Sequence, residues 1–300
     1  MLKESILNEV LKILDLNGFR TITNIGSFDI LARKKETLLL KILLNIDSLS
    51  RDQANDLKIL SSFLSARTFI ISQKTNRCYL SDNTLYYRFG IPVVTLWLFE
   101  RIISERNPDS FSSRGKHLVE IDRNLLRSER TSRGLSLGDL GKKIKMSKKS
   151  LYEIEMGRVR PTAETVEKLE KFFDVKLSVG CQIKIDNNYE EMRPISPLQK
   201  KVYSKLSQLR IRVGCLKKSP FEIIAERRRV IFAGLSESKE DLEKKSRILS
   251  KVSSFTKSTS LIITRESEVE NFGGIPVVLD TEIDEIESYR QLSEMIRSRN

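Results

Sequence analysis

The chain contains the same short pattern twice, and this repeat constrains its fold more than any other feature. Residues 27–42 read SFDILARKKETLLLKI, and residues 220–235 read PFEIIAERRRVIFAGL. Each copy has an aromatic residue, an acid, an apolar stretch, a basic cluster and a second apolar run. The phrase GIPVV follows in both, at residues 90–94 and 274–278. We interpret the two regions as an internal duplication, because order, spacing and particular words agree.

Both copies predict the same order of elements: a helix, one or two strands, an apolar strand, a helix and two more strands. The runs LLLKILL and VIFAGL are apolar on both faces, as in strands at the centre of a covered sheet. Residues 1–103 and 198–300 are therefore predicted to form two α/β domains.

A different pattern lies between the copies. Residues 104–117 and 183–197 are polar and rich in turn formers, and we interpret them as linkers. Between them, residues 118–182 have the apolar spacing of short helices. Ser136 and Ser147 are suitable N-caps of two of these helices, and Gly157 ends the second. Two short helices joined by so tight a turn predict an all-α helix-turn-helix domain.

The stretch SLGDLGKKIKMSKKSLYEIEMGRVRPTAETVEKLEKFFDV resembles the helix-turn-helix of the phage Cro and repressor family, the XRE type. The shared features are a Ser-led second helix, a short turn, a Ser-led recognition helix and a closure from Glu155 through Gly157 to Pro161. The resemblance implies that the recognition helix, Lys148 to about Glu155, enters the major groove of double-stranded DNA. One departure is Leu137, at a position where the family often has a glutamine that contacts the DNA backbone.

Site residues follow from this resemblance and from the chemistry of base edges and phosphates. The residues expected to read bases are Lys148, Lys149, Ser150, Tyr152 and Glu153. The residues expected to contact phosphates are Lys142, Lys143, Lys145, Arg158 and Arg160. Arg130 and Glu155 lie where the family places a structural ion pair.

The flanking α/β domains resemble the PD-(D/E)xK nuclease fold of Holliday-junction resolvases. In that family an Asp and a Glu-x-Lys on neighbouring strands hold Mg²⁺. Asp29 and Lys41 match two of these positions in the first copy, but Leu39 replaces the Glu. The second copy has Glu222, Phe232 and Gly234 at the three positions, and Glu36 belongs to a turn before the strand. Because an apolar side chain cannot ligate Mg²⁺, we expect degenerate domains with no catalytic residue, metal or cofactor.

Composition narrows the class of partner. The net charge is +13 with a pI near 9.6, which favours a polyanionic partner. Three separated cysteines and a single histidine argue against disulfides and zinc. The longest apolar run, residues 91–99, is about half of the ~20 residues of a membrane span. The amphipathic N-terminus is unlike a signal peptide, so a cytoplasmic protein is expected.

The sequence thus predicts a non-enzymatic, sequence-specific regulator of transcription, and over its whole length it resembles the HTH-type transcriptional regulators of archaea. We expect a homodimer on a near-palindromic operator, with the flanking domains used for dimerisation or for binding a partner or effector. Two alternatives stay open: a Mg²⁺-dependent nuclease targeted by the helix-turn-helix, and an antitoxin or adaptor. The operator, the targets, the sign of regulation and the pairing of the α/β domains within or between chains also stay open.

Overall fold

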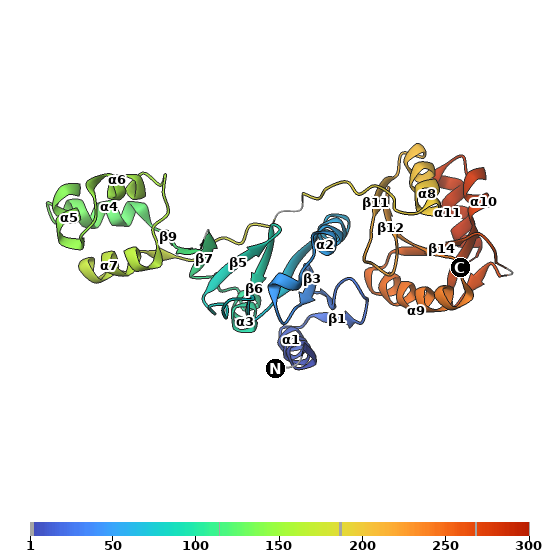
Figure 1. Ribbon diagram of the computed structural model, residues 1–300, viewed down its shortest axis with the longest axis horizontal. Coiled ribbons are helices and arrows are strands. Elements are labelled where there is room, and N and C mark those ends of the chain that lie inside the picture. Colours follow the sequence, from blue (N-terminus) through green and yellow to red (C-terminus); the bar gives the residue numbers. More distant parts are fainter. Residues whose placement is uncertain (1–2, 114, 186–187, 268, 300) are drawn as a thin grey trace. The chain divides into compact units, whose positions relative to one another are not determined.

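A computed structural model describes residues 3–113, 115–185, 188–267 and 269–299 (Figure 1). Contacts divide the chain into two compact units. Unit 1 comprises residues 1–43, 47–70 and 185–300, and unit 2 comprises residues 44–46 and 71–184. Among the described residues, no helix combines the length and apolarity that crossing a membrane requires.

The N-terminal part of unit 1 is a helix-flanked sheet. Its elements are α1 (Lys3–Leu16), β1 (Arg20–Thr23), β2 (Ile30–Arg33), β3 (Thr37–Ile42), the 3-10 turn η1 (Ile46–Ser48, whose first residue belongs to unit 2), α2 (Arg51–Leu64) and β4 (Ala66–Ile71, whose last residue belongs to unit 2). The strand order is β1-β2-β3-β4. Strand β3 is buried from Leu38 to Ile42, as the run LLLKILL predicts for a central strand.

The C-terminal part of unit 1 is a second sheet with its own core. Its elements are α8 (Pro197–Gln208), β11 (Arg212–Cys215), β12 (Ile223–Glu226), β13 (Val230–Ser236), α9 (Lys239–Thr256), β14 (Thr259–Thr264), β15 (Asn271–Phe272), β16 (Ile275–Leu279), α10 (Asp280–Glu285) and α11 (Tyr289–Ser298). The strand order is β11-β12-β13-β14-β16-β15. Strand β14 is parallel to both of its neighbours, and apolar side chains of α8, α10 and α11 join the strands in one core.

The two parts of unit 1 share their local register. Leu31 pairs with Leu39 across β2 and β3, and Ile224 pairs with Phe232 across β12 and β13. Both hairpins are antiparallel, and both are followed by a helix that ends in a left-handed cap, at Ser65 and at Lys257. The repeated sequence lines therefore fold into matching strand pairs.

Unit 2 begins with the remaining strands of the N-terminal region. They are β5 (Thr84–Arg88), β6 (Ile91–Val94), β7 (Ser110–Ser113) and β8 (Lys116–Leu118), in the order β6-β5-β7-β8, with α3 (Leu96–Ile103) between β6 and β7. The helices α4 (Arg123–Ser132), α5 (Leu137–Ile144), α6 (Lys148–Glu155) and α7 (Ala163–Phe173) follow. Strands β9 (Glu120–Ile121) and β10 (Ser178–Val179) pair with each other at the two ends of this helical domain.

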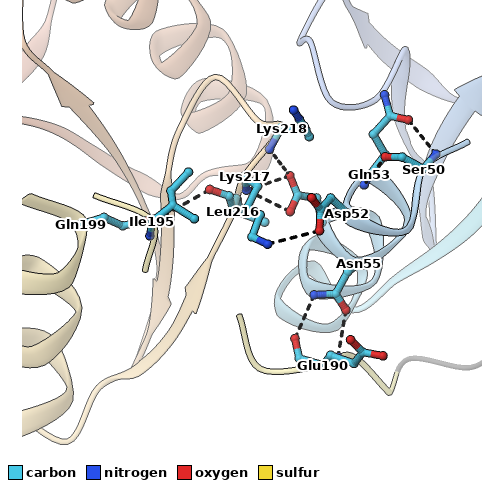
Figure 2. A network of polar contacts seen from close by, with 11 residues as sticks. Ser50, Asp52, Gln53, Asn55, Glu190, Ile195, Gln199, Leu216, Lys217 and Lys218 are labelled. Atoms are coloured by element: carbon cyan, nitrogen blue, oxygen red, sulfur yellow. Dashed lines mark hydrogen bonds and ion pairs between the residues drawn. The ribbon is translucent and has the colours of Figure 1, made fainter. Parts of the chain in front are cut away.

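Two stretches that we expected to be linkers differ from each other. The first, residues 104–117, contains β7 and part of β8, because β7 pairs with β5 at Ser110 and with β8 at Ser112 and Ser113. The hydroxyls of Ser110 and Thr84 lie 2.9 Å apart. The second has no helix or strand at its described residues 188–196, and residues 186–187 of it lie outside the described part. It is nevertheless fixed at Glu190, whose backbone N–H and C=O both bond the side chain of Asn55 at 2.9 Å (Figure 2).

The two parts of unit 1 contact each other reciprocally. Arg212, at the start of β11, lies 4.1 Å from the ring centre of Phe63 in α2. Arg20, at the start of β1, lies 5.8 Å from the ring centre of Phe255 in α9. Each phenylalanine is two residues before the left-handed cap of its helix. A pair of equivalent residues thus exchanges equivalent partners, which is the pattern of a two-fold interface.

The loops before β2 and β12 repeat this exchange. A Cβ on Gly26 would lie 3.1 Å from Pro220, and the hydroxyl of Ser27 donates to that of Ser219 at 3.3 Å. When the two copies of the sequence pattern are aligned, Gly26 corresponds to Ser219, and Ser27 corresponds to Pro220. Positive φ of 99° and close contact with Pro220 both favour glycine at residue 26.

Asp56 of α2 provides the most buried polar contact between these parts. Its side chain is fully buried and accepts the backbone N–H groups of Lys217 and Lys218, at distances from 2.6 to 3.1 Å. The Lys217 ammonium also lies 3.3 Å from Asp52, one turn earlier in α2 (Figure 2). Burial raises the pKa of Asp56 to about 6, against the opposing effect of the two backbone donors.

Candidate nucleic-acid interface

Local capping determines where the helices of the central domain begin. Ser136 and Asp139 form a reciprocal capping box at the start of α5, and Ser147 caps α6 by accepting the N–H of Ser150 at 3.0 Å. Both serines are the N-caps that the sequence predicts, and α6 has the predicted bounds. Leu151 and Ile154 of α6 face the shared core, as expected.

The turn between α5 and α6 leaves no room for a side chain at Gly141. A Cβ there would lie 2.5 Å from the carbonyl oxygen of Met146 and 3.6 Å from Leu151. Lys145 ends α5 in the left-handed conformation, with φ of 57°. The small residue and the left-handed cap together allow α6 to turn sharply away from α5. Leu137 packs against the same core, which accounts for an apolar residue at that position.

Arg130 and Glu155 form a two-pronged ion pair that joins α4 to α6. The distances from Nε to Oε1 and from Nη2 to Oε2 are 2.6 and 3.0 Å, and both side chains are largely buried. Arg130 also donates to the carbonyl of Leu135 at 2.8 Å, and its partner raises its pKa. The pair therefore fixes the position of α6 rather than facing a ligand.

The first turn of α6 presents two lysines to solvent. Within the described part of the chain, Lys148 and Lys149 are exposed and have no hydrogen-bonding or ion-pair partner. Ser150 differs, because its hydroxyl lies 2.8 Å from that of the N-cap Ser147. Its capping contact would have to rearrange before it could contact a base.

Three of the predicted DNA-contacting side chains contact one another. Arg158 lies 3.4 Å from the Glu153 carboxylate and 5.6 Å from the ring centre of Tyr152. Tyr152 is 42% exposed and Arg158 is also exposed, so all three groups border the same face of α6. The exposed arrangement is worth little to stability and leaves each group able to exchange partners.

The other predicted phosphate contacts surround this face. Lys142, Lys143 and Lys145 are exposed at the end of α5, and Lys143 lies 5.9 Å from the ring centre of Phe172. Arg160 pairs with Glu120 at 2.5 Å and stacks 5.2 Å from the ring centre of Phe111. Of these four side chains, Arg160 is the one that would have to release a carboxylate to bind a phosphate.

Two arginines of this domain were not predicted from the sequence. Arg123, the first residue of α4, is exposed, and its guanidinium reaches the position that a Cβ on Gly157 would occupy. It adds a positive charge beside the end of α6. Arg133 donates to the carbonyls of Phe172 and Phe173 at 3.2 and 2.5 Å and so caps α7. Neither residue belongs to an apolar stripe, and the carbonyls that Arg133 caps lie about 40 residues further along the chain, so no local sequence pattern distinguishes these arginines.

The two acids that match the nuclease motif, Asp29 and Glu222, pair with lysines. Asp29 accepts the backbone N–H of Ile42 at 2.7 Å and pairs with Lys3 and Lys41 at 2.6 and 3.6 Å. Glu222 accepts the N–H of Leu235 at 2.8 Å, which lies thirteen residues further on as in the first copy, and pairs with Lys245 at 2.6 Å.

Burial dominates the electrostatics of these sites. It lowers the pKa of Lys41 against the effect of Asp29, and it raises the pKa of Glu222 against the effect of Lys245. Leu39 and Phe232 are fully buried, and Glu36 instead pairs with Arg67 at 3.0 Å. Among the described residues, no cluster of three or more His, Cys, Asp or Glu side chains could hold a metal.

Comparisons with known proteins agree with both parts of this description. The family described as "PD-(D/E)XK superfamily domain" matches residues 3–108, and the family described as "Helix-turn-helix" matches residues 126–179. A "Putative HTH-type transcriptional regulatory protein" of Methanothermobacter thermautotrophicus is 30% identical over 309 residues, covering 99% of this chain and 97% of the relative. Relatives with the same description in Methanocaldococcus jannaschii and Thermococcus gammatolerans are 28% identical over 311 and 306 residues. Each aligns with 99% of this chain, over 98% and 96% of its own length. No solved structure matches the chain.

Proposed function

The chain belongs to the family of HTH-type transcriptional regulatory proteins of archaea, and on that premise we propose that it recognises a specific DNA sequence through α6. The observation that carries this proposal is the first turn of α6, where Lys148 and Lys149 are exposed, have no partner among the described residues and lie near further cations. Lysines at the N-terminal end of a recognition helix can donate to guanine O6 and N7 in the major groove. Tyr152, Glu153 and the capped Ser150 complete the proposed base-reading face.

Cations around the face supply the proposed backbone contacts. The expected phosphate ligands are Lys142, Lys143, Lys145, Arg158 and Arg160. We add Arg123, because the structure places its exposed guanidinium beside the end of α6. Such contacts orient a protein on the duplex without reading sequence, and they make binding dependent on salt.

Binding-site selection tests the base-reading role. Lys149→Ala should relax the preference at one base pair by ~1–3 kcal/mol, because a direct donor to a base edge is lost. Lys168→Ala is the matched control, since Lys168 is an exposed lysine of α7 that pairs with Glu164. An unchanged consensus for Lys149→Ala would remove this residue from the reading face.

We further propose that the α/β regions are a non-enzymatic scaffold that arose by duplication. Matching strand registers and reciprocal Arg–Phe contacts support a common origin. On this proposal, the surface around Arg20, Phe63, Arg212 and Phe255 pairs the two copies within one chain. A second chain is then not needed to cover this surface.

A homodimer on a near-palindromic operator remains our proposal for the bound state, because one chain carries one helix-turn-helix. The dimer contact then has to involve a surface other than the reciprocal one. Sedimentation with a saturating excess of protein over operator duplex should give two chains per duplex. One chain per duplex under these conditions would rule out the dimer without affecting the proposed base-reading role of α6.

A further inference from the structure

The C-terminal part of unit 1 contains a cavity that the proposed function does not use. Its volume is about 590 Å³, and it lies where α9 ends, β13 and β14 begin and α11 runs past them. This volume is within the range of ~300–1,000 Å³ that is typical of small-molecule sites. All of its lining residues belong to one sheet and its helices, so the cavity does not depend on any other domain.

The lining is cationic and rich in hydroxyl groups. Arg229, Lys257 and Arg297 supply the charges, and serine and threonine side chains supply most of the other polar groups. Among the residues described as lining the cavity, none is an aspartate or glutamate. These three cations also have no hydrogen-bonding or ion-pair partner in the described part of the chain. Such a set of cations and hydroxyl donors, with no carboxylate among the lining residues, is complementary to an anion with several oxygens.

The equivalent place in the N-terminal part of unit 1 serves as an internal comparison. In the repeated lines Arg229 corresponds to Glu36, and the start of β14 at Thr259 corresponds to Arg67 in β4. Glu36 and Arg67 pair with each other at 3.0 Å. In the second copy Arg229 stands in place of the acidic Glu36, and Thr259 stands in place of the basic Arg67. The charge is neutralised in one copy and left uncompensated in the other.

Apolar residues among the lining limit what the anion can be. Ile231, Ile275 and Ile296 line the cavity and are almost fully buried, and Tyr289 lines it as well. A phosphate on the backbone of a duplex would use the cations but not this apolar part of the lining. A small organic molecule can place its phosphate among the cations and its carbon skeleton against the isoleucines and the tyrosine.

We propose that this cavity binds a small phosphorylated organic molecule, such as a nucleotide or sugar phosphate. The phosphate would be held by Arg229, Lys257 and Arg297 together with nearby hydroxyls, including those of Ser254 and Ser293. The proposal goes beyond DNA recognition, because the site lies in a different unit from the helix-turn-helix. In a regulator, such a site is where an effector would bind.

Calorimetric titration of the full chain with adenosine monophosphate, inorganic phosphate and adenosine tests the proposal. Saturable binding of the two phosphate-bearing probes is expected, with little binding of adenosine. The double variant Arg229→Gln/Arg297→Gln should weaken phosphate binding at least tenfold. Ser293→Asp, which places a carboxylate in the cavity, should do the same. Arg247→Gln is the control, since Arg247 is an exposed arginine of α9 that pairs with Glu243.

Three results would overturn the proposal. They are no saturable binding of either phosphate-bearing probe, unchanged binding by the double variant, or an equal loss in the Arg247→Gln control. Duplex titrations over a range of salt concentrations separate this site from DNA binding. If the double variant loses DNA affinity and salt dependence but keeps its affinity for adenosine monophosphate, the cations contact the DNA backbone and the proposal fails. If operator binding fails in the wild-type chain while the monophosphate binds, the cavity stands and the proposed function fails.

Discussion

At the scale of single residues, the helix-turn-helix depends on positions where space or charge allows few side chains. Gly141 lies against the backbone of the turn, and the Arg130–Glu155 pair joins two helices from a largely buried position. Removing one partner of such a pair costs about 3–5 kcal/mol, because the other charge stays buried. These residues are largely buried within the domain, and they position α6, which carries the exposed Lys148 and Lys149.

Gly141→Ala should destabilise the helical domain and reduce DNA binding, although alanine favours helices. Its Cβ would approach the Met146 carbonyl to 2.5 Å, and a backbone atom cannot move aside cheaply. Gly138→Ala in the same helix is the control. The nearest atom to its Cβ is the Ser136 hydroxyl at 3.6 Å, and replacing glycine in a helix stabilises by roughly 0.5–1 kcal/mol. Thermal unfolding should therefore move in opposite directions for the two variants, and equal shifts would contradict the steric argument.

At the scale of elements, α2 is the helix that connects the two parts of unit 1. Asp56 receives two backbone donors from the segment before β12, and Asn55 holds the stretch around Glu190 (Figure 2). Burial disfavours the charged form of the Asp56 carboxylate more than its backbone donors favour it, so the charged form lowers the stability of the fold. Its protonation should therefore be visible in the pH dependence of unfolding.

We expect the Asp56 contribution to the free energy of unfolding to fall as pH rises from about 4 to about 6. The pKa of Asp56 is raised to about 6 in the folded chain, so the folded state binds more protons than the unfolded state in this range. Two pH units correspond to about 3 kcal/mol at most. Urea unfolding followed by circular dichroism should show Asp56→Asn gaining stability relative to wild type across this range. Asn55→Ala breaks the neighbouring contact without removing a titrating group, so its difference from wild type should stay constant. A constant difference for Asp56→Asn would contradict the assigned pKa.

At the scale of the whole molecule, residues 3–108 match the PD-(D/E)XK superfamily, while apolar side chains stand at two positions where its motif has a metal-binding acid. Asp29 pairs with Lys41, and Glu222 pairs with Lys245. The buried apolar residues Leu39 and Phe232 stand where the motif has its second acid. Fold and function are separable in this way because the sheet requires apolar packing, whereas the chemistry requires carboxylates at a few points.

We predict that the purified chain with Mg²⁺ or Mn²⁺ leaves both duplex and four-way-junction DNA uncut. Leu39 and Phe232 cannot supply an oxygen ligand, and each remaining acid is paired with an ammonium. Incubation with labelled substrates over a range of metal concentrations checks this. Cleavage that Asp29→Ala abolishes would show that another ligand completes the site and would restore the nuclease alternative.

The sequence by itself determined the helices of the DNA-binding domain and the repeated strand pairs. Caps such as Ser136 and Ser147 act within three residues, and the apolar run at Leu38–Ile42 is buried wherever a sheet forms around it. Only the tertiary structure decided which distant groups meet. The reciprocal contact of Arg20 with Phe255, the burial of Asp56 and the lack of a partner for Arg229 among the described residues all depend on residues from separate elements. Whether a charge is paired is a property of three-dimensional distance, and sequence spacing carries no information about it across the 162 residues between Asp56 and Lys218.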